Sequence, residues 1–411
     1  MLKNKIIYEP FSDWRLTISK AQGSFLWDQV GNKFIDFTSG WNVTNLGWNH
    51  PELRKALIRQ VKMNAYAPMW TSDPIQEQYA NALVQSLPKG LCAIGRATSG
   101  TEANEEAIKV AKAYTGRRKM VGFARTYHGQ SSFTLALGYL SEKDLRQDPM
   151  YQNFIQIEFP TITNEQQNEK ELLKDFSEQL EGILCKSDVA AIITEAGIIT
   201  GWGSARIAPK GFLQTIRKLT KKYGTILILD EVGTGFSRCG ELYGMHLEGV
   251  IPDIVTFAKG STNGAAVLGT MVTTKEIAEK SFEKATLIST FGWTPIACAV
   301  GLRTLQLHLE LKLWERAAQE GSYLLETLQA ALNNDSRVTY IAGKGMIVGV
   351  HFTLSSGNPL VTKIVDQAQK IGLHLVCDQD ATIQLMPPLT IPRSVLNKGI
   401  DIFTSVIKST K

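Results

Sequence analysis

The sequence predicts an α/β fold with a mainly parallel central sheet. Short apolar runs rich in β-branched side chains, typical of strands buried on both faces, stand at Lys119–Ala124, Val189–Thr194, Thr225–Asp230 and Asp253–Ala258. Amphipathic helical patterns separate several of these runs, for example from Gly211 to Tyr223. Strands that alternate with helices form parallel sheets, because the chain must cross back over the sheet between neighbouring strands.

The two ends of the chain differ from this central part. The first 55 residues combine aromatic and turn residues with short alternating runs. Towards the other end, a long helical pattern from about Thr294 to Ala331 precedes alternating strand and helix patterns from Lys344 onward. A length of 411 residues suits two or three domains. We therefore predict a large domain over residues 56–300 and a smaller α+β domain built from residues 1–55 and 301–411.

Composition argues against several classes of protein. The hydrophobic fraction of 44% and the charged fraction of 20% are those of an ordinary globular chain. The net charge is only +5 and no long basic run is present, so nucleic-acid binding is not expected. Neither an apolar leader nor a stretch of about 18 uncharged apolar residues is found, so we expect a cytoplasmic protein without a membrane span. Five scattered cysteines and six dispersed histidines predict neither a disulfide framework nor a metal site.

A turn of small residues is the first candidate binding site. Ser99, Gly100 and Thr101 precede a run of alanine and aliphatic residues at helical spacing, Glu105–Tyr114. The backbone N–H groups at the start of such a helix suit a phosphate. Because small polar residues also cap many helices, the motif by itself leaves a purely structural role open.

An acidic pair, Asp230 and Glu231, ends the predicted strand Thr225–Asp230. In an open parallel sheet the carboxyl ends of the strands line the ligand crevice. A carboxylate there is desolvated unless a cation or a donor, such as a protonated pyridine nitrogen, meets it. A magnesium site is the alternative, but no G-x-x-x-x-G-K-[ST] loop accompanies the pair.

A lysine at the end of the next predicted strand favours one of these interpretations. Lys259 follows Asp253–Ala258 and precedes a loop of small residues, Gly260–Gly264. Burial in a crevice lowers the pKa of an amine and makes it a nucleophile towards aldehydes. A lysine that forms a Schiff base, together with an aspartate for a pyridinium nitrogen, is the arrangement that pyridoxal 5'-phosphate requires. The sequence therefore predicts this cofactor on Lys259.

With these residues the chain resembles the class III (ω-amino acid type) aminotransferases over nearly its whole length. The matching blocks are Asn45–Gly47 with His50-Pro51, Ser99–Asn104, Tyr127–Gly129, Asp230–Phe236, Pro252–Gly260, Ser289–Gly292 with Pro295, Gly343–Met346 and Pro387–Leu389. Each block is modest, but their order and spacing are shared with the family. The resemblance implies the fold-type I architecture of pyridoxal-phosphate-dependent transferases.

The resemblance also implies catalytic roles. Lys259 would hold the cofactor and shuttle a proton, while Asp230 would bond the pyridine nitrogen. Glu195 would lie near the substrate side of the ring. Val232 and Tyr127 would pack on its two faces.

Further residues would bind the cofactor's phosphate end. Ser99, Gly100 and Thr101 would hold the phosphate at the helix start, and His128 belongs to the same set of cofactor-binding residues. Thr290 would reach the phosphate from the neighbouring subunit, so the resemblance implies a homodimer with shared active sites.

Departures from the family pattern fall on the substrate side. Many members carry Gln where this chain has Gly233, so a contact to the ring hydroxyl is missing. After the glutamate, members usually continue P-x-Q-G-E-G-G, whereas Ala196–Gly203 stands here, and Phe291–Pro295 replaces the motif F-G-G-N-P. Members that use α-amino acids often carry Arg three residues before the Pro-Pro pair, where this chain has Gln384. Arg binds a carboxylate bidentately and Gln cannot.

Three tryptophans, Trp41, Trp70 and Trp202, fall at or near segments that line the family's substrate pocket, although they could equally be core or interface aromatics. With Gln384 they favour an amine or carbonyl substrate without a free α-carboxylate, as a small molecule or borne on a carrier or peptide. Other candidates to hold an anionic group are Arg96, Arg125 and Arg206.

We therefore predict aminotransfer by a ping-pong route. An aminomutase, epimerase or decarboxylase on the same fold is the alternative, because the cofactor residues cannot separate these reactions. A catalytically degenerate binding protein is the other. A nicotinamide oxidoreductase is disfavoured, since no G-x-G-x-x-G follows an early strand.

Overall fold

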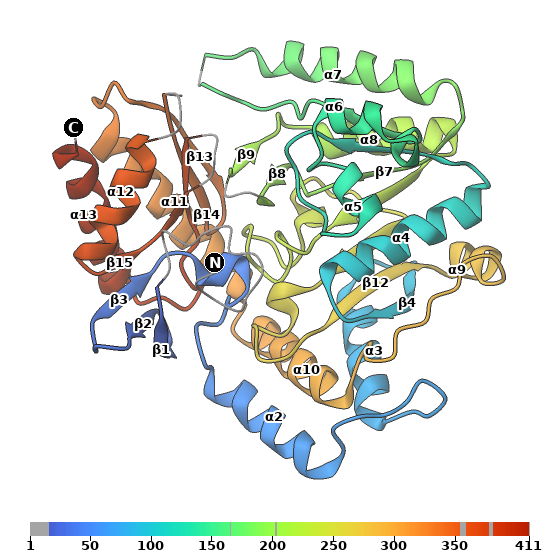
Figure 1. Ribbon diagram of the computed structural model, residues 1–411, viewed down its shortest axis with the longest axis horizontal. Helices are drawn as coiled ribbons and strands as arrows, with labels where there is room; N and C mark the ends of the chain where they lie inside the picture. Colours follow the sequence, from blue (N-terminus) through green and yellow to red (C-terminus); the bar gives the residue numbers. More distant parts are fainter. Residues whose placement is uncertain (1–15, 165, 202–203, 354–358, 378–380, 411) are drawn as a thin grey trace, which may run out of the picture.

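The computed structural model describes residues 16–164, 166–201, 204–353, 359–377 and 381–410. Its centre is a seven-stranded sheet in the order β4-β12-β11-β10-β7-β5-β6 (Figure 1). The strands are β4 (Leu91–Ala97), β5 (Lys119–Phe123), β6 (Phe154–Ile157), β7 (Val189–Thr194), β10 (Ile226–Asp230), β11 (Ile254–Phe257) and β12 (Gly269–Thr274). All neighbours pair in parallel except β12, which runs antiparallel to both β4 and β11. The predicted α/β fold and the four predicted strands are confirmed.

Side chains of the central strands alternate between two apolar cores. Leu227 and Leu229 of β10 belong to the core on which α3 (Pro74–Ser86), α7 (Glu169–Leu184) and α8 (Phe212–Tyr223) pack. Ile226 and Ile228 belong to the core beneath α4 (Gly100–Thr115). Because side chains alternate along a strand, Asp230 at the end of β10 faces the α4 side.

The other elements between residues 39 and 310 are mostly short. They are α1 (Ser39–Asn42), α2 (Pro51–Met63), α5 (Ser132–Ala136), α6 (Glu142–Gln147), α9 (Lys275–Ser281), α10 (Pro295–Glu310), the strands β8 (Ile198–Ile199) and β9 (Arg206–Ile207), and the 3-10 helices η2 (Pro149–Tyr151), η4 (Gly244–Leu247) and η5 (Lys259–Ser261). The helices α2 and α10 are longer and lie against each other. Figure 1 shows α2 along α10 at the bottom of the molecule. Among the helices that the structure describes, none has the length and apolar character needed to cross a bilayer.

The helical pattern expected from Thr294 to Ala331 is two helices rather than one. The chain leaves α10 at Leu311, and α11 (Leu313–Leu332) begins after Lys312. Lys312 has a left-handed φ of 45°, which no helix interior accommodates, so the helix must stop there.

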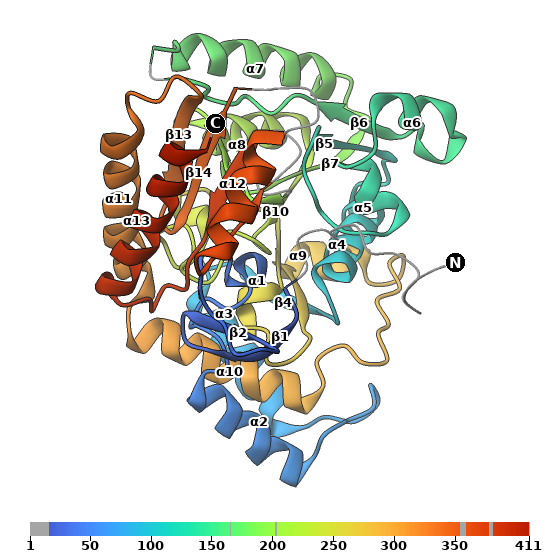
Figure 2. The ribbon, with the colours of Figure 1, turned by 60° about the vertical axis from the view of Figure 1, so that its left-hand side comes forward.

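Both ends of the chain meet in a smaller α+β part on the left of Figure 1. The strands β1 (Ile18–Gln22), β2 (Phe25–Asp28) and β3 (Lys33–Asp36) share a sheet with β15 (Leu373–His374), which pairs in parallel with β3. A second sheet contains β13 (Val338–Lys344), β14 (Ile347–Phe352), β17 (Thr382–Leu385) and β16 (Val376–Cys377). Figure 2 shows α11, α12 (Pro359–Lys370) and α13 (Arg393–Ser409) beside it. A smaller domain from both chain ends is thus confirmed, and its boundaries at residues 55 and 300 stay predictions.

Candidate active site

A cavity of about 400 Å³ lies where the central strands end and α4 begins. Its walls come from the segments that follow β4, β5, β7, β10 and β11, as expected for the ligand crevice of an open sheet. Nine of the residues predicted from the sequence line it: Ser99, Gly100, Thr101, Tyr127, His128, Glu195, Asp230, Val232 and Lys259.

Lys259 is the first residue of the 3-10 helix η5, two residues after the end of β11, and is partly buried in the cavity wall. Its φ of 36° is left-handed, a conformation that a residue with a side chain adopts at a cost in energy. Burial lowers the pKa of the Lys259 amine, while the nearby charges of Glu195 and Asp230 act in the opposite direction. A partly desolvated amine is more readily deprotonated and can attack a carbonyl carbon.

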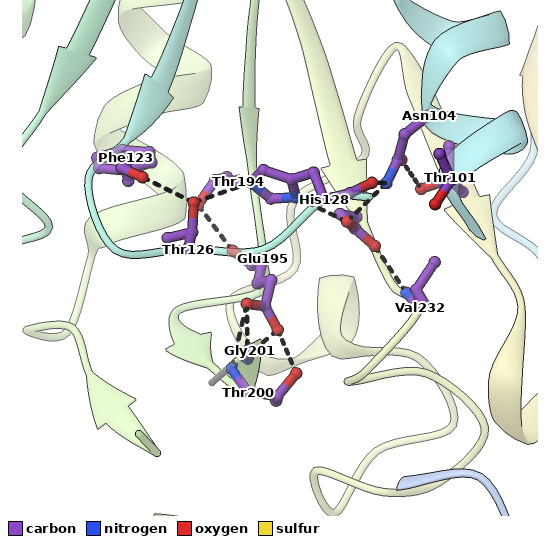
Figure 3. Close-up of polar contacts among 12 residues, drawn as sticks. Thr101, Asn104, Phe123, Thr126, His128, Thr194, Glu195, Thr200, Gly201 and Val232 are labelled. Atoms are coloured by element: carbon purple, nitrogen blue, oxygen red, sulfur yellow. Dashed lines mark hydrogen bonds and ion pairs between the residues drawn. The ribbon is translucent and has the colours of Figure 1, made fainter. Parts of the chain in front are cut away.

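Asp230 is fixed in orientation by three N–H donors. Its Oδ2 accepts from His128 Nδ1 at 2.7 Å and Asn104 Nδ2 at 2.9 Å, and its Oδ1 accepts from the Val232 N–H at 2.9 Å (Figure 3). The adjacent Glu231 faces the other way, where it accepts from the backbone N–H groups of Gly244 and Met245. The two acidic residues therefore differ in role: Asp230 lines the cavity, whereas Glu231 hydrogen-bonds the backbone on the other side.

A second layer of polar groups supports Asp230. The Asn104 amide also donates to the His128 carbonyl at 2.8 Å and accepts from Thr256 Oγ1 at 2.7 Å. Thr126 Oγ1 lies 3.3 Å from His128 Nε2. Sequence reasoning assigned no role to these three supporting residues. A signal existed for Asn104, because it stands one helical turn after Gly100 and so projects from the same side of α4.

Glu195 is buried at the end of β7 and is held by the loop that follows. Thr200 donates to it twice, from its backbone N–H at 2.9 Å and from its hydroxyl at 2.5 Å, and the Gly201 N–H lies 3.4 Å away (Figure 3). Burial and the charge of Asp230 raise the pKa of Glu195, whereas the hydrogen bonds from Thr200 lower it. Sequence reasoning did not identify Thr200.

The start of α4 forms another wall of the cavity. Ser99 is the N-cap, and its hydroxyl accepts from the Glu102 N–H at 3.2 Å. A Cβ atom on Gly100 would lie 3.0 and 3.1 Å from the two methyl groups of Val232, so glycine permits this close packing. The free N–H groups and the dipole of a helix start attract anions.

These walls fit pyridoxal phosphate chemically. The start of α4 suits the phosphate, the fixed carboxylate of Asp230 suits a protonated pyridine nitrogen, and the Lys259 amine suits the aldehyde. All three lie around one cavity.

The predicted substrate residues that the structure describes do not line this cavity. Trp41 comes nearest, since its indole N–H approaches the Thr200 carbonyl at 3.5 Å. Trp70 and Thr290 are exposed, and Gln384 is buried in β17 with no hydrogen-bond partner for its amide among the described residues. Trp202 is outside the described residues. None of the arginines named from the sequence, Arg96, Arg125 and Arg206, lines the cavity.

Comparison with known proteins identifies the family. The profile described as Aminotransferase class-III matches residues 8–407. The chain is 29% identical over 406 residues to an acetylornithine aminotransferase of Methanothermobacter thermautotrophicus, which covers 99% of this chain and 97% of that protein. An acetylornithine aminotransferase of Bacillus anthracis is also 29% identical, over 98% of this chain and 97% of that protein.

Solved structures agree with the sequence comparison. An (S)-enantioselective omega-transaminase from Thermomicrobium roseum is 31% identical, with a TM-score of 0.89 over 96% of this chain and 92% of that chain. A Bacillus anthracis aminotransferase is 28% identical, with a TM-score of 0.91 over 98% of this chain and 95% of that chain. The cavity, the family profile and these relatives lead to one conclusion: the chain belongs to the class III aminotransferases and is a pyridoxal-phosphate-dependent enzyme that transfers amino groups.

Proposed function

We propose that this aminotransferase acts on an amine donor or carbonyl acceptor that carries no free α-carboxylate. The observation that supports this is the charge of the cavity wall. Among the described lining residues Lys259 is the one lysine and none is an arginine. Lys259 would itself be engaged with the cofactor. An α-carboxylate is usually held by a bidentate arginine. Gln384, which stands where α-amino-acid enzymes of the family often have that arginine, is neutral.

The chain's own residues would divide the work in a ping-pong cycle. When bound, pyridoxal phosphate supplies an electron sink for the carbon that loses a proton. Lys259 would hold the cofactor, and its amine would take up and return that proton. Asp230 is oriented by His128 and Asn104, and its carboxylate would pair with the pyridine nitrogen. Tyr127 and Val232 line the cavity and would confine the ring on its two faces.

The proposed substrates include small ω-amines and amines or carbonyls borne on a carrier or peptide. Relatives named acetylornithine aminotransferases provide the strongest competing candidate, because acetylornithine is an ω-amine that also carries an α-carboxylate. Acetylornithine is therefore the substrate against which the proposal must be measured.

Donor-dependent bleaching of the yellow holoenzyme tests this proposal. Purified enzyme is mixed with acetylornithine, with glutamate and with ω-amines that lack a carboxylate, and the loss of visible absorbance is followed. We expect a carboxylate-free amine to react with the highest kcat/KM. A higher kcat/KM for acetylornithine or glutamate would contradict the substrate proposal. Formation of many product molecules per enzyme without any carbonyl acceptor would instead favour a mutase, epimerase or decarboxylase.

We also propose that the active unit is a homodimer with shared active sites. Large apolar side chains are exposed near Thr290: Ile288 is 64% and Phe291 62% exposed, and the Phe291 ring lies 5.8 Å from that of Tyr66. Trp70, 82% exposed, follows in the same connection between α2 and α3. Adjacent exposed apolar side chains are typical of interfaces. In a dimer, Thr290 would reach the phosphate in the other subunit's cavity.

Light scattering and a Thr290→Val variant test the dimer. We expect a dimer in solution, and we expect the variant to remain dimeric but to bind pyridoxal phosphate more weakly. A fully active monomer would contradict the proposal, as would a variant with unchanged cofactor affinity.

A further inference from the structure

Gly233 has no room for a side chain. A Cβ atom built on it would lie 2.0 Å from Thr200 Oγ1 and 3.3 Å from Glu195 Oε2. Its φ is not in the left-handed region, so the need for glycine is steric. The space beside Gly233 is therefore already filled by the hydroxyl of Thr200, and both residues line the cavity.

Thr200 is held firmly in that place. It directly follows β8, is fully buried, and donates to Glu195 from both its N–H and its hydroxyl. Its carbonyl accepts from the Trp41 indole at 3.5 Å. The next residue, Gly201, packs so closely on Tyr127 that a Cβ there would lie 2.8 Å from the Tyr127 Cβ.

Two departures from the class III pattern meet at this contact. Many members carry Gln at position 233, and in the usual motif P-x-Q-G-E-G-G the fifth residue after the glutamate is a second Glu. This chain has Gly233 and Thr200 instead. The hydroxyl of Thr200 occupies the volume that a side chain at position 233 would fill.

We propose that Thr200 is a positioning residue for aminotransfer. Its hydroxyl occupies the space that a side chain at position 233 would need, and from there it holds the Glu195 carboxylate on the side of Lys259. The titratable groups that act on Glu195 are Asp230, His128 and Lys259. Glu195 and Lys259 both line the cavity, and the negative charge of Glu195 acts to raise the pKa of the Lys259 amine. The inference rests on the proposed role of Lys259 in holding the cofactor.

The hydroxyl can be tested with Thr200→Val, which keeps the shape, and Thr200→Ser, which keeps the hydroxyl. The readout is the pH titration of the yellow absorbance of the substrate-free holoenzyme. Because the Thr200 hydrogen bonds lower the pKa of Glu195, loss of the hydroxyl should leave Glu195 less ionised and so shift the midpoint measurably in the Val variant. The shift should be to lower pH. The negative charge of Glu195 stabilises the protonated Lys259 nitrogen, and this stabilisation weakens when Glu195 is less ionised. The Ser variant should titrate like the wild type.

Equal midpoints for the wild type and the Val variant would overturn the proposal. A wild-type protein that shows no yellow band after incubation with pyridoxal phosphate would instead contradict the proposed function, so the two failures are distinguishable.

A double-mutant cycle tests the shared volume. Gly233→Gln alone should weaken pyridoxal phosphate affinity, because the new side chain meets Thr200 and displaces Glu195. When Gly233→Gln is combined with Thr200→Gly, the affinity for pyridoxal phosphate should partly recover. Such non-additivity is expected for groups in contact. Thermal unfolding of the cofactor-free variants monitors folding. Additive losses in cofactor affinity, or a double variant weaker than both single variants, would refute the shared volume.

Discussion

The substitution Asp230→Asn is expected to reduce both stability and catalysis. The carboxylate accepts three hydrogen bonds, from His128 Nδ1 and Asn104 Nδ2 on one oxygen and from the Val232 N–H on the other. An amide has a single acceptor oxygen, so in either orientation its NH2 group faces at least one of these donors. An unsatisfied buried donor costs about 1–3 kcal/mol. The free energy of unfolding of the cofactor-free variant should fall by that amount.

The loss in catalysis should exceed the loss in stability. Asn lacks the negative charge with which Asp230 would stabilise the protonated pyridine nitrogen. The loss of one preorganised electrostatic partner typically costs about 100-fold or more in rate. The assay is the single-turnover rate of bleaching with the best amine donor. Urea unfolding of the cofactor-free protein measures stability on the same preparation.

Glu231→Gln is the matched control. Glu231 is the next residue, is equally buried and also accepts three hydrogen bonds, from Thr234 Oγ1 and the Gly244 and Met245 N–H groups, but it faces away from the cavity. The control should therefore lose stability while keeping the rate of the chemical step. A wild-type rate in Asp230→Asn, or an equal loss of rate in Glu231→Gln, would refute the role of Asp230.

Three further outcomes are expected. Lys259→Ala should leave the fold intact but abolish turnover and the yellow band, and retained steady-state activity would contradict the role of Lys259. Gln384→Arg should raise kcat/KM for glutamate, and an unchanged or lower value would count against our interpretation of that position. Burial raises the pKa of Glu231 to about 7 from the ordinary 4.5, so its protonated form is favoured in the folded state. Stability should therefore fall as pH rises from 4.5 to 7, by up to about 3 kcal/mol relative to Glu231→Gln, which lacks this titration. Parallel pH profiles in urea unfolding would contradict this.

The cofactor end of the site could be predicted from sequence because its residues stand next to recognisable elements. Lys259 and Asp230 end apolar runs that are strands, and Ser99 precedes a helix. The supporting contacts could not be predicted in the same way. Asn104 meets Thr256 and Asp230 because α4 lies over β10 and β11, and that placement depends on the strand order. A single sequence shows the strands but not their order, nor that β12 is reversed between β4 and β11.

The substrate side was harder to predict because family positions do not fix where a side chain lies. Trp70 matches a pocket segment but is 82% exposed in the single chain, so a contribution to any cavity requires a second subunit. Gln384 is buried in β17 outside the cavity wall, so its effect on substrate choice would act through neighbours or a rearrangement. The proposal about α-carboxylates therefore depends more on the lack of an arginine among the described residues of the cavity wall than on these two residues.

Departures from a motif also have to be considered in pairs. Taken alone, Gly233 indicates a lost contact to the cofactor and Thr200 an unremarkable change in a loop. In space the hydroxyl of Thr200 lies 2.0 Å from where the missing Cβ would be, and it donates to Glu195. Thr200 thus fills the space left by the missing side chain at position 233 and hydrogen-bonds Glu195 from there. The surroundings of Glu195 are therefore maintained by a different residue than in members with Gln at that position. A degenerate binding protein would have no need to keep that carboxylate in place, so the pair favours an active enzyme, and the cycle of Thr200 and Gly233 variants tests this argument directly.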